Sequence, residues 1–196
     1  MTGEYYITKE LLKQHSPCID GYRWFCENYP NGGKYQEILD KLCADNRFND
    51  ACWLLDEMGA TTDELEINTL EDDNKLICFA GSVIVENRIK VESIRVGGGI
   101  KAGWYIKAGE GINASWYIKA GEDIVAGGDI KAGWGIKAGG DIKAGGYIEA
   151  GNDYGIYAGL NVRLSEQEQY GYITAKEKPE NIMCGNWKEE DKPNEQ

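Results

Sequence analysis

A six-residue repeat in the second half of the chain is the feature that most limits how this protein can fold. From Ile94 to Ile148 an isoleucine stands at every sixth position, ten times in succession. Alanine, or Val96 in the first unit, follows two residues later, and glycine comes next in nine of the ten units, Ser115 being the exception. A period of six scatters the isoleucines around a helix but places each Ile and its Ala on one face of a short strand. The unit Ile-x-Ala-Gly-x-x therefore predicts short strands, and we expect glycine to turn the corners with positive φ.

Short strands joined by regular corners indicate a β-solenoid with an inner wall of Ile and Ala. Three units per coil give 18 residues and a triangular section, whereas two units give 12 residues and a flattened coil. Residues 104–110 recur identically at 116–122, and residues 127–133 at 139–145, so a spacing of twelve stays open. We favour three sides because a row of isoleucines on each wall needs interior width. The predicted fold class is mainly β, a β-solenoid (β-helix) preceded by a small α-helical domain.

Degenerate repeat units extend the solenoid in both directions. Ile84 and Ile89 keep strand character upstream, and residues 156–159 and 172–175 restore it downstream. Irregular outer coils are what a solenoid needs to protect its open edges. The expected organisation is a helical domain over residues 1–60, an acidic connector over 61–75, the β-solenoid over 76–175, and a C-terminal cap with a charged tail over 176–196.

The N-terminal sixty residues carry helical signals instead of the repeat. Thr8 and Asp20 are candidate N-caps of two short helices. Apolar residues at helical spacing indicate two more, the last ending at Gly59. Residues 31–33, Asn-Gly-Gly, separate the two pairs. A compact domain of four short helices is therefore expected.

Composition limits the environment and the partners. The 196 residues carry 33 acidic and 21 basic side chains, a formal net charge of −12. This charge argues against direct, sequence-independent binding of nucleic acid. No apolar run reaches the ~18 residues that a membrane span needs, and the first residues lack the pattern of a secretory signal. Six cysteines without such a signal indicate reduced thiols. We expect a cytoplasmic protein with no membrane partner.

Four short segments of the helical domain carry a resemblance to known proteins. They are residues 7–10 (ITKE), Cys18, residues 23–25 (RWF) and residues 51–55 (ACWLL). Together they resemble a helical module of bacteriophage and prophage proteins, which often precedes repetitive β-helical sequence. The resemblance implies a mobile-element origin and an anti-defence protein, of the anti-CRISPR or anti-restriction kind, acting in the cytoplasm of the host bacterium. It implies no chemistry.

Catalytic chemistry has few candidates in this sequence. Hexapeptide β-helices are best known from acyltransferases, but there the small residue precedes the aliphatic one by two positions, whereas here alanine follows it. Those enzymes also need a histidine base between coils, and the only histidine, His15, lies in the helical domain. No C-x₂-C pair sets a zinc geometry, and no GxxxxGK phosphate loop occurs. We expect no enzyme, no cofactor and no metal site.

Binding is therefore the expected activity, with the aromatic corners as its candidate site. Trp and Tyr are favoured anchors at protein interfaces. With 18-residue coils Trp116 stacks over Trp134, and with 12-residue coils it lies over Trp104. The candidate protein-binding residues are Trp104, Tyr105, Trp116, Tyr117, Trp134 and Tyr147, together with the acidic Glu71, Asp72 and Asp73.

Three functions remain open from the sequence. The one we favour is a phage-encoded inhibitor that binds a host protein or protein–nucleic-acid complex, such as a CRISPR effector or a restriction enzyme. The second is a structural protein that assembles through its solenoid ends into a homo-oligomer, as bactofilin-like proteins do. The third is direct binding of nucleic acid, because 12-residue coils would align a phosphate track of Arg95, Lys107, Lys119, Lys131 and Lys143.

Overall fold

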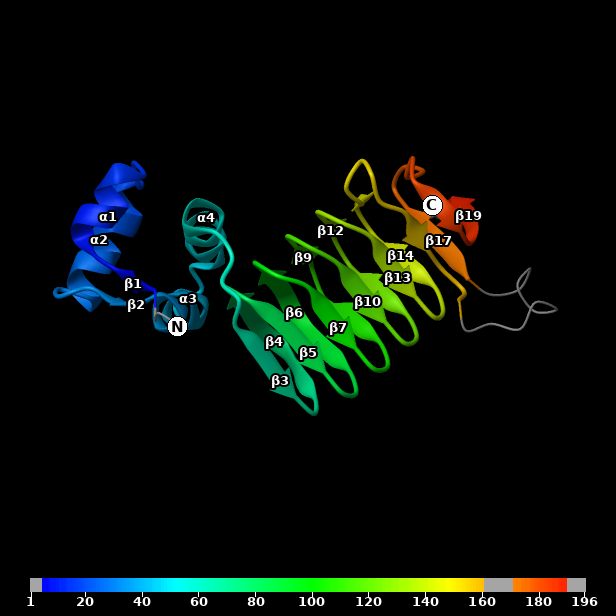
Figure 1. The fold of residues 1–196 in the computed structure, drawn as a ribbon, viewed down its shortest axis with the longest axis horizontal. Helices are drawn as coiled ribbons and strands as arrows, with labels where there is room; N and C mark the ends of the chain where they lie inside the picture. The colour runs from blue at the N-terminus through cyan, green and yellow to red at the C-terminus, as the bar shows by residue number, and fades with distance from the viewer. Residues whose placement is uncertain (1–4, 161–170, 190–196) are drawn as a thin grey trace, which may run out of the picture.

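The computed structural model describes residues 5–160 and 171–189. Figure 1 shows a helical domain at one end of the long axis and a coil of short strands along the rest. The helical domain contains a two-stranded ribbon and four helices: β1 (Tyr6–Ile7), α1 (Lys9–Gln14), α2 (Ile19–Asn28), β2 (Gly33–Lys34), α3 (Tyr35–Ala44) and α4 (Phe48–Met58). Within the described ranges, no helix is long and apolar enough to cross a membrane.

The helix termini follow the sequence signals with one correction. Thr8 caps α1, its hydroxyl oxygen accepting a hydrogen bond from the backbone N–H of Leu11 at 3.2 Å. Asp20 does not cap α2: Cys18 is the N-cap, its sulfur accepting from the Gly21 N–H at 3.2 Å. The helix begins at Ile19, one residue before Asp20, and the Asp20 carboxylate instead pairs with Arg47 at 2.7 Å. α4 ends at Met58, and Gly59 follows as its C-cap with a positive φ of 79°.

The solenoid has three walls, and each wall is a parallel stack of short strands. The first wall contains β3 (Glu64–Ile67), β5 (Ser82–Val85), β7 (Ile100–Ala102), β10 (Ile118–Ala120), β13 (Ile136–Ala138), β16 (Ile156–Tyr157) and β18 (Ile182–Cys184). The second contains β8 (Ile106–Ala108), β11 (Ile124–Ala126), β14 (Ile142–Ala144), β17 (Tyr172–Ala175) and β19 (Asn186–Glu189), and the third β9 (Ile112–Ala114), β12 (Ile130–Ala132) and β15 (Ile148–Glu149). Two long strands, β4 (Leu70–Phe79) and β6 (Ile89–Val96), run from the second wall into the third.

Strand register fixes the coil at 18 residues. Ile118 pairs with Ile100 on one side and with Ile136 on the other, all in parallel. The predicted three-sided coil is thus confirmed, and the solenoid makes about six turns. Within each unit the Ile and Ala side chains point inward and are buried, while the residue between them points outward. The twelve-residue identities relate strands on different walls.

The glycine after each alanine has a different role from the one expected. In the repeat between Ile94 and Ile148 no glycine has a positive φ. A Cβ on Gly121 would lie 1.9 Å from the carbonyl oxygen of Gly103, and one on Gly127 would lie 2.0 Å from that of Gly109. Glycine is therefore used for the close approach of successive coils, not for its left-handed conformations.

Both ends of the solenoid extend further than the sequence indicated. The segment expected as an acidic connector, residues 61–75, contributes β3 and the first part of β4 to the first coil. The segment expected as a cap contributes β18 and β19, which pair in parallel with β16 and β17. These strands were not predicted because their many charged, outward-facing residues obscure the weak alternation of apolar and polar positions. Residues 190–196 of the expected charged tail lie outside the described residues.

The helical domain is joined to the solenoid through β4. Leu76, Cys78 and Ala80 pack with the helical core, while Ile77 and Phe79 face the solenoid core. Alternation along one strand thus serves two hydrophobic cores. The amide of Gln36 in α3 continues this contact, accepting from the Ala80 N–H at 2.9 Å and donating to the Cys78 carbonyl at 3.0 Å.

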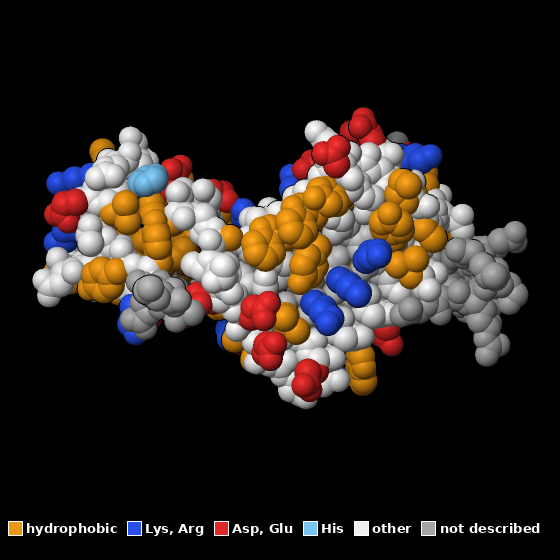
Figure 2. Space-filling view, in the orientation of Figure 1, with side chains coloured by type: hydrophobic (Ala, Val, Ile, Leu, Met, Phe, Trp, Pro, Cys, Tyr) orange, Lys and Arg blue, Asp and Glu red, His pale blue; other side chains and the backbone are white. Residues whose placement is uncertain are grey.

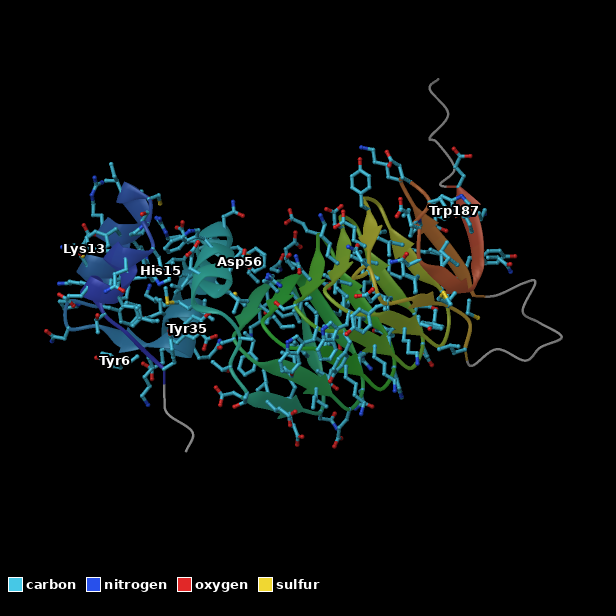
Figure 3. The ribbon with its side chains drawn as sticks, turned by 45° about the horizontal axis from the view of Figure 1, so that its top comes forward. Tyr6, Lys13, His15, Tyr35, Asp56 and Trp187 are labelled. Atoms are coloured by element: carbon cyan, nitrogen blue, oxygen red, sulfur yellow. The ribbon has the colours of Figure 1, made fainter. Side chains whose placement is uncertain are left out.

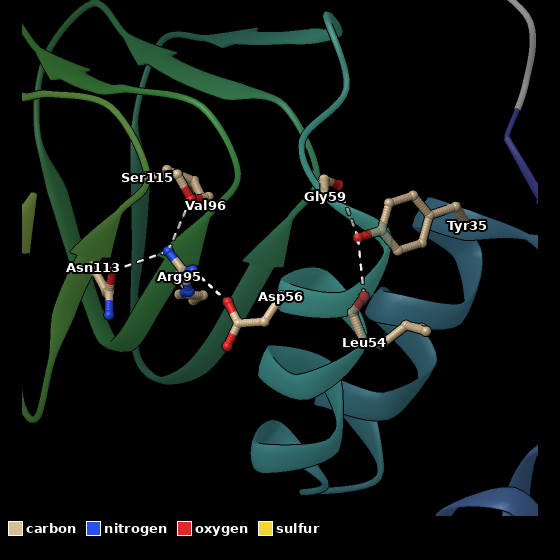
Figure 4. A network of polar contacts seen from close by, with 8 residues as sticks. All are labelled: Tyr35, Leu54, Asp56, Gly59, Arg95, Val96, Asn113 and Ser115. Atoms are coloured by element: carbon tan, nitrogen blue, oxygen red, sulfur yellow. Dashed lines mark hydrogen bonds and ion pairs between the residues drawn. The ribbon is translucent and has the colours of Figure 1, made fainter. Parts of the chain in front are cut away.

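A polar network at the junction holds α4 against the third wall. Arg95 of β6 pairs with Asp56 at 2.6 Å and donates to the Asn113 side chain at 2.9 Å (Figure 4). Figure 3 shows Asp56 on the side of α4 that faces the solenoid. Nearby, the hydroxyl of Tyr35 donates toward the carbonyls of Leu54 and Gly59, at 3.4 and 3.2 Å. The junction is therefore a packed interface rather than a free linker.

Candidate protein-binding surface

Three aromatic rings form a column at the corner between the third and first walls. The Trp116 and Trp134 rings stack with centroids 5.5 Å apart and planes 9° apart. Tyr154 continues the stack at 5.9 Å and 20° from Trp134. We call Trp116, Trp134 and Tyr154 the aromatic column. The stacking of Trp116 over Trp134 predicted for an 18-residue coil is confirmed.

Tyr117 widens this surface beside the column. Its ring lies 6.4 Å from that of Trp134 and covers Gly99, where a Cβ would come within 2.5 Å of the tyrosine Cζ. Trp134 and Tyr154 are 42% and 45% exposed, although stacking covers part of each ring. These rings lie outside the Ile and Ala core, so packing of the solenoid interior does not account for them.

Sequence reasoning missed Tyr154 because it lies in an insertion. The repeat is broken at residues 152–155, and Tyr154 falls twenty positions after Trp134 instead of eighteen. The two extra residues lengthen the corner but keep the tyrosine on the same edge. Adding the insertion length to an assumed coil of 18 residues would have placed it there.

The other predicted aromatic residues lie at other corners. Trp104 and Tyr105 follow β7, at the corner between the first and second walls. Tyr147 precedes β15, at the corner between the second and third walls, where Lys176 lies 5.2 Å from its ring centroid. Only Trp116, Tyr117 and Trp134 of the predicted aromatic set are therefore brought together.

The predicted acidic residues lie in the first coil and are largely engaged. Glu71 pairs with Arg88 at 2.8 Å, and Asp73 pairs with Lys90 at 2.7 Å. The Asp72 carboxylate accepts from the backbone N–H of Asn74 at 3.1 Å. These contacts bind the irregular part of β4 to the following coil. They place the acidic group away from the aromatic column.

Aspartates at the corners tie one coil to the next. The carboxylates of Asp123 and Asp129 each accept a hydrogen bond at 2.8 Å from the backbone N–H eighteen residues later, those of Asp141 and Tyr147. The Tyr147 N–H and the Lys131 ammonium hold the pKa of Asp129 below its ordinary value. These carboxylates are structural, in agreement with their placement at corners.

The basic residues do not form the track that a 12-residue coil predicts. Lys119 lies on the first wall, Lys107 and Lys143 on the second, and Arg95 and Lys131 on the third. A different set is aligned: Lys101, Lys119 and Lys137 are paired in register on β7, β10 and β13. We call these three residues the lysine row. Figure 2 shows Lys and Arg side chains in line across the front of the solenoid, with hydrophobic side chains near them.

The remaining reactive side chains lie mostly in the helical domain. His15 contacts Glu57 at 2.9 Å on its surface. Cys43 and Cys78 are buried at the junction, and burial raises the pKa of the Cys43 thiol to about 12. Across the described ranges, no group of three or more His, Cys, Asp or Glu side chains is arranged to hold a metal ion. A cavity of about 390 Å³ among the four helices is lined mainly by apolar side chains.

Fold and surface together define the class of protein: a three-sided β-solenoid that begins with a helical domain and carries an exposed aromatic column. Comparison with family models adds one finding. Residues 1–61 match the model of the YdhT N-terminal domain, a match that covers α1 to α4 and ends before the first coil. No curated protein gives a significant match to the chain, and no solved structure does.

Proposed function

We propose that this chain is a non-enzymatic protein-binding module that inhibits a host nucleic-acid-handling defence complex, such as a CRISPR effector or a restriction enzyme. The observation that carries the proposal is the aromatic column, with Tyr117 beside it. Stacked Trp and Tyr rings on an exposed edge are the side chains that most often anchor protein interfaces. A rigid solenoid also holds them in place before binding, which lowers the entropy lost on association.

The choice of target rests on charge and on the helical module. The chain has a net charge of −12, and complexes that handle nucleic acid expose basic surfaces that attract such a chain over long range. Residues 7–10, 23–25 and 51–55 resemble a module of phage and prophage proteins, a setting in which inhibition of host defence is useful. The proposed location is the cytoplasm of the host bacterium.

The proposal is tested by removing two rings of the column. Trp116→Ala with Trp134→Ala removes a stack worth about 0.5–1.5 kcal/mol, so we expect the melting temperature to fall by only a few degrees. Truncation of an interfacial Trp commonly costs about 2 kcal/mol or more, so the pair should abolish capture of the target. Phage plating on a host that carries the defence system, with each variant expressed, measures the inhibition.

Trp104→Ala is the matched control, because Trp104 is 49% exposed but lies at a different corner. It should leave both melting and inhibition unchanged. Full inhibition by the Trp116 and Trp134 double variant, with its fold intact, would move the binding surface elsewhere and remove the support for this proposal.

The two alternative functions have less support. End-to-end assembly needs a free first coil, but α3 and α4 pack against β4 at that end. A nucleic-acid track of five basic residues needs a 12-residue coil, and the register gives 18. A homo-oligomer formed through another surface stays compatible with the proposal.

A further inference from the structure

The lysine row lies on the first wall, and the aromatic column runs parallel to it along the corner between the third and first walls. Each column ring in the repeat is followed three residues later by a row lysine, Trp116 by Lys119 and Trp134 by Lys137. Neighbouring residues within each line are one coil apart, about 4.8 Å. Three residues of chain span at most about 10 Å. The two lines therefore border a strip no more than about 10 Å wide that runs along the solenoid axis.

Within residues 5–160 and 171–189, the lysine row lacks the carboxylate partners that some other basic residues have. Lys131 and Lys143 are paired with aspartates, and Lys90 with Asp73. Among the described residues, Lys101, Lys119 and Lys137 have no ion pair, although Lys137 lies 5.1 Å from the Tyr157 ring centroid. Like charges directly opposite in a sheet are destabilising. A chain with 33 acidic side chains nevertheless keeps this row positive.

The spacing of the row suits an α-helix better than an extended peptide. One helical turn rises about 5.4 Å. Three carboxylates on successive turns would therefore lie out of line with three lysines on successive coils by only roughly 1.2 Å at the far end. Same-face residues of a strand repeat every ~6.7 Å and drift by nearly 4 Å over the same distance. A helix is also about 10–12 Å across, which matches the width of the strip.

We propose that this strip binds an acidic amphipathic α-helix of the target protein. Carboxylates on successive turns contact Lys101, Lys119 and Lys137, and the neighbouring apolar face of the helix packs on the aromatic column. This inference rests on the proposed function and names the chemistry of the segment that the surface recognises.

The test uses the full chain and designed helical peptides. The probe is an 18-residue peptide with Glu at positions i, i+4 and i+7. Leu at positions i+1, i+5 and i+8 forms the neighbouring apolar face of the helix. The control peptide has the same composition with its Glu residues scattered around the helix. We expect the probe to bind more tightly than the control in fluorescence anisotropy, with an affinity that falls as salt rises.

Lys119→Glu and Lys107→Glu are the matched variants. Both lysines are exposed at the centre of Ile-Lys-Ala strands, but Lys107 lies on the second wall. Lys119→Glu should weaken probe binding at least about fivefold, and Lys107→Glu should not change it. The fold should survive Lys119→Glu, because the new carboxylate would lie between Lys101 and Lys137 on the neighbouring strands. A variant with all three row lysines replaced by Glu should bind a probe that carries Lys in place of Glu.

Three results would overturn the inference: equal binding of probe and control peptides, equal effects of the two lysine variants, or tighter Lys119-dependent binding of an oligo-dT strand. The last result would assign the strip to nucleic acid. The inference and the proposed function fail separately. If the probe and control peptides bind equally and the Trp116 and Trp134 variant still loses inhibition, the helix is excluded while the aromatic surface stands.

Discussion

At the residue scale, glycine in the repeat is set by contact between coils. The Gly121 N–H donates to the Ala102 carbonyl at 3.1 Å, and the absent side chain lets the backbone reach the preceding coil. Ser115 shows that the position is not closed to every side chain, and its hydroxyl accepts from Arg95 at 3.3 Å. From the sequence we expected these glycines to turn the corners with positive φ. The structure shows that they are needed for contact between coils, which a local pattern does not reveal.

Gly121→Ala should therefore lower the free energy of unfolding, and Gly111→Ala should not. A Cβ at Gly121 would lie 1.9 Å from the Gly103 carbonyl oxygen, whereas one at Gly111 would meet only atoms at 3.7 Å. Overpacking at Gly121 should lower stability by about 1–3 kcal/mol. At Gly111 the loss of unfolded-state freedom should leave stability unchanged or raise it by up to about 1 kcal/mol. Urea unfolding measures both, and equal effects would contradict the close-approach explanation.

At the element scale, the repeat predicts each strand, but its period of six leaves both a two-walled and a three-walled grouping of the strands open. Burial of Ile and Ala follows from alternation alone, and the three walls followed from the interior width that isoleucine rows need. The aromatic residues could be sorted only once the coil length was known, because Trp104 and Trp116 share a sequence context but lie on different edges. The first and last coils were missed because charged outward residues and insertions obscure their repeat.

The junction between α4 and β6 offers an element-scale prediction. Arg95 is 14% exposed in its side chain and bridges Asp56 to the third wall. Arg95→Ala should weaken the docking of α4 by about 1.5–3 kcal/mol, the range for hydrogen bonds to a charged group. Hydrogen exchange should then quicken in α4 while β10 and β13 stay protected.

Arg88→Ala is the control for that measurement. Arg88 also pairs with a carboxylate, Glu71 at 2.8 Å, but joins two solenoid coils. It should leave exchange in α4 unchanged. If Arg95→Ala also leaves α4 unchanged, the packing of Leu76, Cys78 and Ala80 holds the domain without the ion pair.

At the scale of the whole molecule, the helical domain determines which end of the solenoid is open. α3 and α4 cover the third-wall part of β4, and the domain projects along the long axis beyond the first coil (Figure 1). A cavity of about 680 Å³ lies between α3 and the first coil, and another solenoid that stacked on β4 would have to displace the helices packed there. Open filaments need two complementary ends, because head-to-tail contacts must repeat.

We therefore expect the full chain to form nothing larger than a closed oligomer, and removal of residues 1–59 to change this. The truncation exposes Leu76, Cys78 and Ala80, together with the unpaired edge of β4, and such an edge is a template for association. Light scattering should show a constant mass for the full chain over a hundredfold range of concentration. The truncated chain should grow in mass as concentration rises. Filaments of the full chain would show that the helical domain does not block the end, and would favour the structural function over inhibition.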